Sequence, residues 1–156
     1  MGARDDLEAY RRTNLARLLF ESSRVLSARA NDAIRAQGFP ELRDSHVQVM
    51  VHLALEGSRA TELAARAGMT KQAMGRLVDE VERIGLVERS PDPADGRARL
   101  VRPTREGRRF YRVARKCIDE ALGQLAADVG EARVARLQRD LAHVVRALAV
   151  VMPDEE

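Results

Sequence analysis

The sequence predicts a mainly α-helical fold with one two-stranded β-hairpin. Apolar residues recur at helical spacing over most of the 156 residues. Only the stretch from Leu86 to Val101 combines β-prone segments with a run of turn-forming residues. Two short helical segments, separated by a glycine, come directly before that stretch. This order is typical of a winged helix-turn-helix, here flanked by longer helices on both sides.

The segment before the helix-turn-helix is expected to hold two helices. The first runs from about Leu7 to Ala36, where leucine and valine recur on one stripe, and Gly38 with Pro40 ends it. The second runs from about Asp44 or Ser45 to Leu55. The length of 156 residues suits one domain and is too short for two full ones, so we expect a single domain.

The helix-turn-helix is expected from Ala60–Ala67 and Lys71–Ile84. Gly68 suits the left-handed position after the first helix, and Thr70 is well placed as the N-cap of the second. The i, i+3, i+4, i+7 spacing predicts which face of the second helix is buried. That face consists of Met74, Leu77, Val78 and Val81.

The hairpin strands are expected at Leu86–Arg89 and Ala98–Val101, joined by a long tip over Ser90–Arg97. The second strand should end at Pro103, since proline donates no ladder hydrogen bond. Thr104 is the expected N-cap of a long helix. The last two helices are predicted at Arg105–Val129 and at about Glu131–Val151, with Gly130 between them.

Composition excludes several classes of protein. No apolar run approaches the length of a membrane span, and the polar N-terminus does not resemble a signal peptide, so we expect a cytoplasmic location. Cys117 is the only cysteine, which excludes an internal disulfide and a cysteine-built zinc site. We find no phosphate-binding glycine loop, serine elbow or paired-histidine metal motif. The sequence therefore predicts no enzyme, no metal and no cofactor.

Charge is unevenly distributed along the chain. The net charge is +3, but the stretch from Arg89 to Arg112 holds eight arginines against three acidic residues, an excess of +5. A GC-rich genome explains arginine in place of lysine but does not explain this clustering. An arginine-dense edge favours contact with a polyanion, nucleic acid above all.

Polar residues of the predicted second helix of the helix-turn-helix lie opposite its apolar stripe. Gln72 is suited to read adenine, Arg76 to read guanine, and Lys71 to contact phosphate or guanine. Gly75 would let the backbone approach a duplex, and Thr70 with the helix N-terminus would hold a phosphate. The alternative is an ordinary solvated helix face.

The hairpin tip carries a second candidate contact. Arg97 and Arg99 are long cations suited to a narrow, negative minor groove. Asp95 is placed to pair with the Arg97 guanidinium. The alternative is an ordinary turn, in which Asp-Gly is common for backbone reasons.

Five segments together resemble the MarR family of bacterial transcriptional regulators. In chain order they are Thr61–Ala64, Gly68–Met74, Leu77–Glu82, Gly85–Arg89 and Asp92–Arg97. Their order and spacing within residues 45–107 make the resemblance specific, although Pro103 stands where the family usually has leucine.

The resemblance implies one domain over residues 1–156. It has a DNA-binding lobe at 45–103 and dimerisation helices at 5–37 and 104–152. It further implies an obligate homodimer on a pseudo-palindromic operator at the bacterial nucleoid. The family's DNA contacts map onto Thr70, Lys71, Gln72, Arg76, Asp95 and Arg97.

The resemblance also implies a repressor that a small aromatic or anionic effector releases from DNA. By layout, the effector would bind between the dimerisation helices and the lobe. Candidate lining residues are Phe20, Arg24, His46, Met50 and Phe110. Several of these have the spacing of core residues. The alternatives are a non-specific architectural DNA-binding protein, or a related regulator that responds to oxidation at Cys117.

Overall fold

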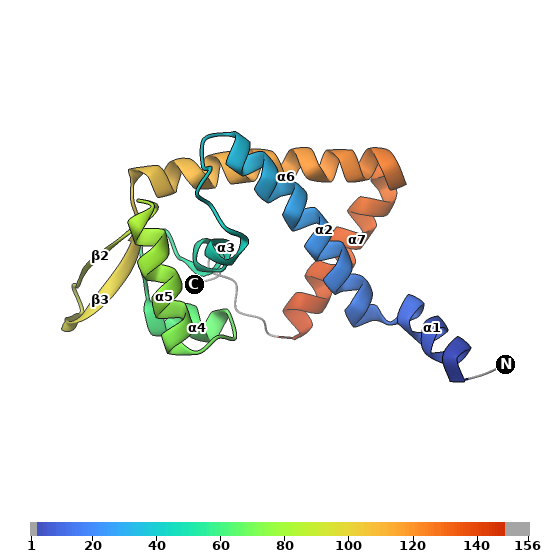
Figure 1. Ribbon diagram of the computed structural model, residues 1–156, viewed down its shortest axis with the longest axis horizontal. Coiled ribbons are helices and arrows are strands. Elements are labelled where there is room, and N and C mark those ends of the chain that lie inside the picture. Colours follow the sequence, from blue (N-terminus) through green and yellow to red (C-terminus); the bar gives the residue numbers. More distant parts are fainter. Residues whose placement is uncertain (1–2, 149–156) are drawn as a thin grey trace.

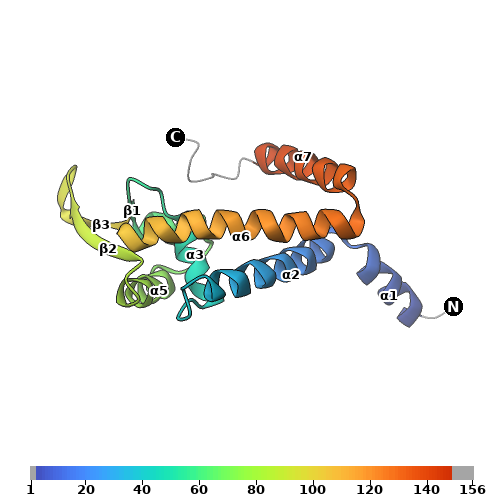
Figure 2. The same ribbon diagram turned by 90° about the horizontal axis from the view of Figure 1, so that it is seen from above.

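The computed structural model describes residues 3–148 and confirms a mainly helical fold with a small sheet (Figure 1). In chain order the elements are α1 (Ala3–Thr13), α2 (Leu15–Ala36), α3 (Asp44–His52), β1 (Ser58–Arg59), α4 (Ala60–Arg66), α5 (Lys71–Arg83), β2 (Val87–Asp92), β3 (Asp95–Pro103), α6 (Arg105–Val129) and α7 (Glu131–Ala147). The helices α3 to α5 and the strands form a lobe at one end of α6. At the other end lie α1 and α7, and α2 runs beside α6 (Figure 2).

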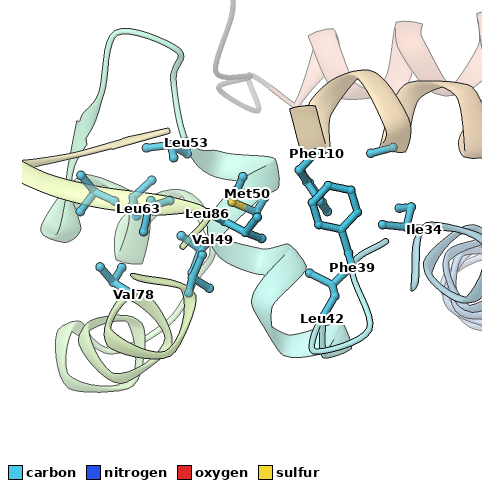
Figure 3. Close-up of a cluster of buried hydrophobic side chains, with 14 of the residues drawn as sticks. Ile34, Phe39, Leu42, Val49, Met50, Leu53, Leu63, Val78, Leu86 and Phe110 are labelled. Carbon is cyan, nitrogen blue, oxygen red and sulfur yellow. The ribbon is translucent and has the colours of Figure 1, made fainter. Parts of the chain in front are cut away.

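The core lies where the lobe meets α2 and α6. Figure 3 shows Phe39 and Phe110 facing each other, with ring centroids 5.5 Å apart in an edge-to-face arrangement. Met50 and Val49 of α3 continue the cluster towards Leu63 of α4. One continuous core therefore holds the lobe to the long helices.

The predicted first helix is interrupted, contrary to our expectation. Asn14 adopts an extended conformation and its side chain accepts a hydrogen bond from the backbone N–H of Arg17 at 2.9 Å. It therefore acts as the N-cap of α2 and ends α1. Asparagine competes with helical hydrogen bonding through such local contacts, and periodicity alone does not reveal it.

The helix-turn-helix agrees with prediction. Gly68 takes a positive φ of 62°, and the Thr70 hydroxyl accepts from the backbone N–H of Ala73 at 3.1 Å. On α5, Met74, Val78 and Val81 are buried, and Leu77 is half-buried. The predicted core face of α5 is confirmed.

The sheet has three antiparallel strands in the order β1-β3-β2. The predicted hairpin corresponds to β2 and β3, and the prediction missed β1. The two-residue strand β1 pairs with β3 through Ser58 and Val101. The strands β2 and β3 are longer than predicted and leave only residues 93–94 between them. Pro91 lies within β2, which tolerates it as an edge strand, and β3 ends at Pro103 as expected.

Apolar side chains are exposed at the end of the molecule away from the lobe. On α7 these are Leu137 and Val144, with Leu148 directly after the helix, and on α1 and α2 they include Tyr10, Leu15 and Phe20. The predicted end of the last helix at Val151 lies outside the described residues. Across residues 3–148, no helix combines the length and apolar character needed to cross a bilayer.

The start of α6 lies unusually close to the end of α5. The Thr104 hydroxyl caps α6 by accepting from the Gly107 N–H at 3.0 Å, and it donates to the Gly85 carbonyl at 2.6 Å. A Cβ atom at Gly107 would lie 2.0 Å from the Leu86 carbonyl oxygen. A glycine is therefore required where a capping box would have glutamate.

We predict that Gly107→Ala destabilises the protein. The added methyl overlaps a backbone oxygen that other bonds hold in place, and overpacking of this kind costs about 1–3 kcal/mol. Urea unfolding at one protein concentration measures the change. The control is Gly123→Ala on the same helix, where no heavy atom lies within 4 Å. There alanine should stabilise the helix by about 0.5–1 kcal/mol. Equal effects of the two substitutions would contradict the prediction.

Candidate nucleic-acid interface

The outer face of α5 presents the residues that the sequence singled out. Lys71, Gln72 and Arg76 are exposed, opposite the buried stripe that anchors the helix. A Cβ at Gly75 would meet no heavy atom within 4 Å. The protein interior does not require glycine there, which leaves close approach by an external molecule as a reason for it.

Several cations of α5 and β3 lack protein partners. In the part of the chain that the structure describes, no ion pair or side-chain hydrogen bond engages Lys71, Arg76, Arg97 or Arg99. Neighbouring Asp79 is instead paired with Arg89 at 2.6 Å. These four charges remain available for an external anion.

The wing tip, residues 92–97, is organised differently from our expectation. Asp95 was expected to hold the Arg97 guanidinium, but its Oδ1 accepts from the Arg97 backbone N–H at 3.1 Å. Its Oδ2 lies 3.7 Å from Nη2 of Arg59. Aspartate readily bonds the backbone two residues ahead in turns, and this contact leaves the Arg97 side chain free to project.

Arg59 makes a contact that sequence reasoning missed. Its Nε and Nη2 donate to Oδ2 of Asp92 at 2.8 and 2.6 Å. The Ala94 backbone N–H and the Arg59 guanidinium lower the pKa of Asp92, which is 7% exposed. The two residues are 33 positions apart, so no local motif signals the pair.

Arg89 was also missed as a functional candidate. Its guanidinium pairs with Asp79 and Glu82 of α5, and its backbone N–H donates to Glu82 Oε1 at 3.1 Å. These bonds tie β2 to α5. They fix the orientation of the wing base relative to the exposed face of α5.

A buried histidine ties α3 to α5. His46 is fully buried, and its Nδ1 accepts from the Arg43 backbone N–H at 3.2 Å. The ring proton therefore lies on Nε2, which donates to Glu80 Oε2 at 2.9 Å. The same oxygen accepts from Arg43 Nη1 at 3.1 Å. The hydrogen bond from His46 lowers the pKa of Glu80, and Arg43 adds to this effect.

The five candidate effector residues fall into two groups. Phe20 and Arg24 are exposed on α2, whereas His46, Met50 and Phe110 are buried in the lobe core. Two surface hollows on α6 and on α1 with α2 are lined by other residues, among them Arg112, Lys116 and Arg17. The assignment of an effector site to these five residues stays a prediction.

Cys117 lies on the buried face of α6, and burial raises the pKa of its thiol. A raised pKa keeps the thiol protonated and lowers its reactivity towards oxidants. Over residues 3–148, no group of three or more His, Cys, Asp or Glu side chains is arranged to hold a metal ion.

The lobe and the chain as a whole are similar to known proteins. Residues 41–98 match the family model described as MarR family. A MarR family transcriptional regulator from Rhodococcus sp. RHA1 is 27% identical, with a TM-score of 0.66, over 92% of this chain and 95% of that one. The lobe therefore matches the MarR family over residues 41–98, and the whole chain is similar in fold to a solved member of that family.

Two further proteins are also similar to this chain. CouR from Rhodococcus jostii RHA1, solved with p-coumaroyl-CoA, is 29% identical over 85% of this chain and 92% of its own, with a TM-score of 0.65. An HTH-type transcriptional regulator of Mycobacterium tuberculosis is 29% identical over 71% of this chain and 75% of its own length. The proteins to which this chain is similar are described as transcriptional regulators.

We predict that the Glu80 contact stabilises the lobe in a pH-dependent manner. The folded state lowers the pKa of Glu80, so its contribution is complete above the ordinary glutamate pKa of about 4.3. It is lost as the pH falls through the lower folded pKa. The difference in unfolding free energy between wild type and Glu80→Gln should therefore shrink on acidification.

Chemical unfolding at a series of pH values measures this difference. The control is Glu88→Gln, which removes an exposed carboxylate of β2 with no side-chain partner among the described residues. A Glu80→Gln effect that is as small as the control effect at neutral pH would exclude the proposed contribution.

Proposed function

We propose that a homodimer of this chain binds a pseudo-palindromic operator and represses transcription at the bacterial nucleoid in the cytoplasm. Each α5 would enter a major groove, and each wing an adjacent minor groove. The observation that carries this proposal is the set of exposed cations without protein partners on α5 and β3. Arg76, Arg97 and Arg99 lack partners there, while neighbouring Arg59 and Arg89 are held in ion pairs.

The proposed roles follow from side-chain chemistry. Gln72 and Arg76 read base edges, and Lys71 contacts phosphate or guanine. The first-turn amides of α5, with Thr70, hold a phosphate, and Gly75 allows close approach. At the tip, Arg97 and Arg99 enter the minor groove, and Asp95 fixes the Arg97 backbone.

The exposed apolar face supports the proposed dimer. Leu137 and Val144 on α7, with Leu148 at its C-cap, would meet apolar residues of α1 and α2 from a second copy. Burial of such side chains is the main driving force of association. In this proposal residues 45–103 form the DNA-binding lobe, and residues 5–37 and 104–152 the dimerisation helices.

We further propose that a small aromatic or anionic effector releases the DNA. The support is the likeness to CouR, whose structure holds p-coumaroyl-CoA. That compound is therefore the first probe, titrated into the protein–operator complex. Release of the duplex at concentrations that leave free DNA unaffected would support the proposal, and unchanged binding would exclude this class of thioester. Oxidation at Cys117 is a weaker alternative, because its thiol is buried.

We predict that the protein binds a duplex from its own upstream region more tightly than a scrambled duplex of equal length, with a steep salt dependence. Gln72→Ala should lower this preference by about 1–3 kcal/mol, because it removes a base contact. Fluorescence anisotropy across a salt series measures both quantities. The control is Gln48→Ala, an exposed glutamine of α3.

Two results would contradict this reading. Equal affinity of the wild-type protein for both duplexes would favour a non-specific architectural DNA-binding protein. A uniform loss on both duplexes in Gln72→Ala would make Gln72 a positioning contact, since only base contacts distinguish sequences.

We predict that Leu137→Glu combined with Val144→Glu converts the dimer into a monomer. Two carboxylates would have to be buried without partners in the proposed interface, which costs several kcal/mol. Analytical ultracentrifugation measures the mass in solution. Gln138→Glu, an exposed neighbour on α7, should leave the dimer intact. A dimer that survives the double substitution would place the interface elsewhere.

A further inference from the structure

The wing tip is poorly fixed by the sheet itself. The β2–β3 register shifts between Pro91 and Asp92, which interrupts the regular ladder before the turn. Pro91 also lacks an N–H group to donate. Residues 93–97 are all exposed, so no buried apolar side chain anchors them. The position of the tip must depend on other contacts.

One buried carboxylate provides such a contact. Asp92 lies at the end of β2, and its Oδ1 accepts from the Ala94 N–H at 2.8 Å, which closes the turn. Its Oδ2 accepts two hydrogen bonds from Arg59. Because both nitrogens belong to one rigid guanidinium, the two bonds fix the orientation of the Asp92 carboxylate relative to Arg59 as well as the distance between them.

The same guanidinium reaches the other strand of the tip. Arg59 Nη2 lies 3.7 Å from Asp95 Oδ2, and Asp95 Oδ1 accepts from the Arg97 backbone N–H. Arg59 therefore connects to the backbone of Arg97 through one intermediate side chain. The Arg97 side chain itself remains unpaired among the described contacts.

Arg59 is itself held at the start of α4. Its backbone N–H donates to Glu62 Oε2 at 2.9 Å, and it pairs in β1 with Leu100 of β3. Because α4 packs against α5, a bond from Arg59 to the tip relates the tip to the recognition face. Arg89 does the same at the base of β2, so the wing is fixed at two points along its length.

We propose that Arg59 is a positioning residue for DNA binding. Its bonds to Asp92 and Asp95 fix the wing tip to the start of α4 and thereby set where Arg97 lies relative to α5. This inference rests on the proposed function of the wing. The Arg59 side chain is 39% exposed and that of Asp92 only 7%, so the pair contributes to the stability of the lobe as well as to the position of the tip.

The first test measures tip order without DNA. In Arg59→Gln, amide ¹⁵N relaxation should show lower order for residues 94–97 than in the wild type, measured at a temperature at which both proteins are folded. Arg83→Gln is the matched control, because Arg83 also pairs with a carboxylate, Glu41 at 3.5 Å, on the surface of the same lobe. It should leave tip order unchanged. Unchanged order in Arg59→Gln would overturn the proposal.

The second test is a double-mutant cycle on the upstream duplex. Arg59→Gln should weaken binding about threefold to tenfold in the wild-type background and hardly at all in Arg97→Ala. The same loss in both backgrounds would show that Arg59 does not act through Arg97. Arg59→Lys keeps the positive charge but loses the planar fork, so it should also weaken binding. Wild-type affinity in Arg59→Lys would make Arg59 a simple charge contact.

The two tests separate the positioning role from the proposed function. Lower tip order in Arg59→Gln, together with a wild-type protein that does not prefer the upstream duplex, would retain the tip contact and reject the sequence-specific regulator. In the opposite outcome, unchanged tip order in Arg59→Gln with a wild-type protein that prefers the upstream duplex, the positioning role is overturned and the proposed function stands.

Discussion

The contact between Gly107 and the Leu86 carbonyl fixes how the lobe sits on the long helices. The end of the α5 segment, the end of β3 and the start of α6 meet within this junction, where Thr104 donates to Gly85 and caps α6. Close behind it, Phe110 packs edge-on against Phe39. Because the junction is built from backbone atoms and one core, the lobe and α6 are expected to move together rather than as independent bodies.

Local chemistry determines most of what the sequence predicts correctly. Helical periodicity, the Thr70 and Thr104 caps and the positive φ of Gly68 all depend on residues within one or two turns. The predictions that were wrong depend on residues far apart in the sequence or on a hydrogen bond that one side chain makes. Strand β1 exists because β3 returns beside Ser58, and the break at Asn14 follows from a side-chain bond. The proposed groove-facing residues could be chosen from the pattern, whereas the Arg59–Asp92 and His46–Glu80 pairs could not.

The clustered arginines, which composition treats as one group, separate into two sets in the structure. Arg89 binds carboxylates of α5, and Arg109 lies 4.7 Å above the Phe39 ring while donating to the Gln37 carbonyl. Arg97 and Arg99 have no such partners in the described chain. Net charge therefore overstates the number of cations free for DNA. Pairing and burial, rather than density along the sequence, indicate which ones remain available.

The residues of α5 that pack against the protein are different from those on its outer face. Met74, Val78 and Val81 fasten the helix to the core, and Glu80 fastens it to His46. Lys71, Gln72 and Arg76, which we assign to the operator, lie outside this packing. Substitutions at the outer positions therefore carry little folding cost. Under the DNA-binding role proposed here, duplicated copies of this lobe can diverge in the DNA sequence they recognise while keeping one scaffold.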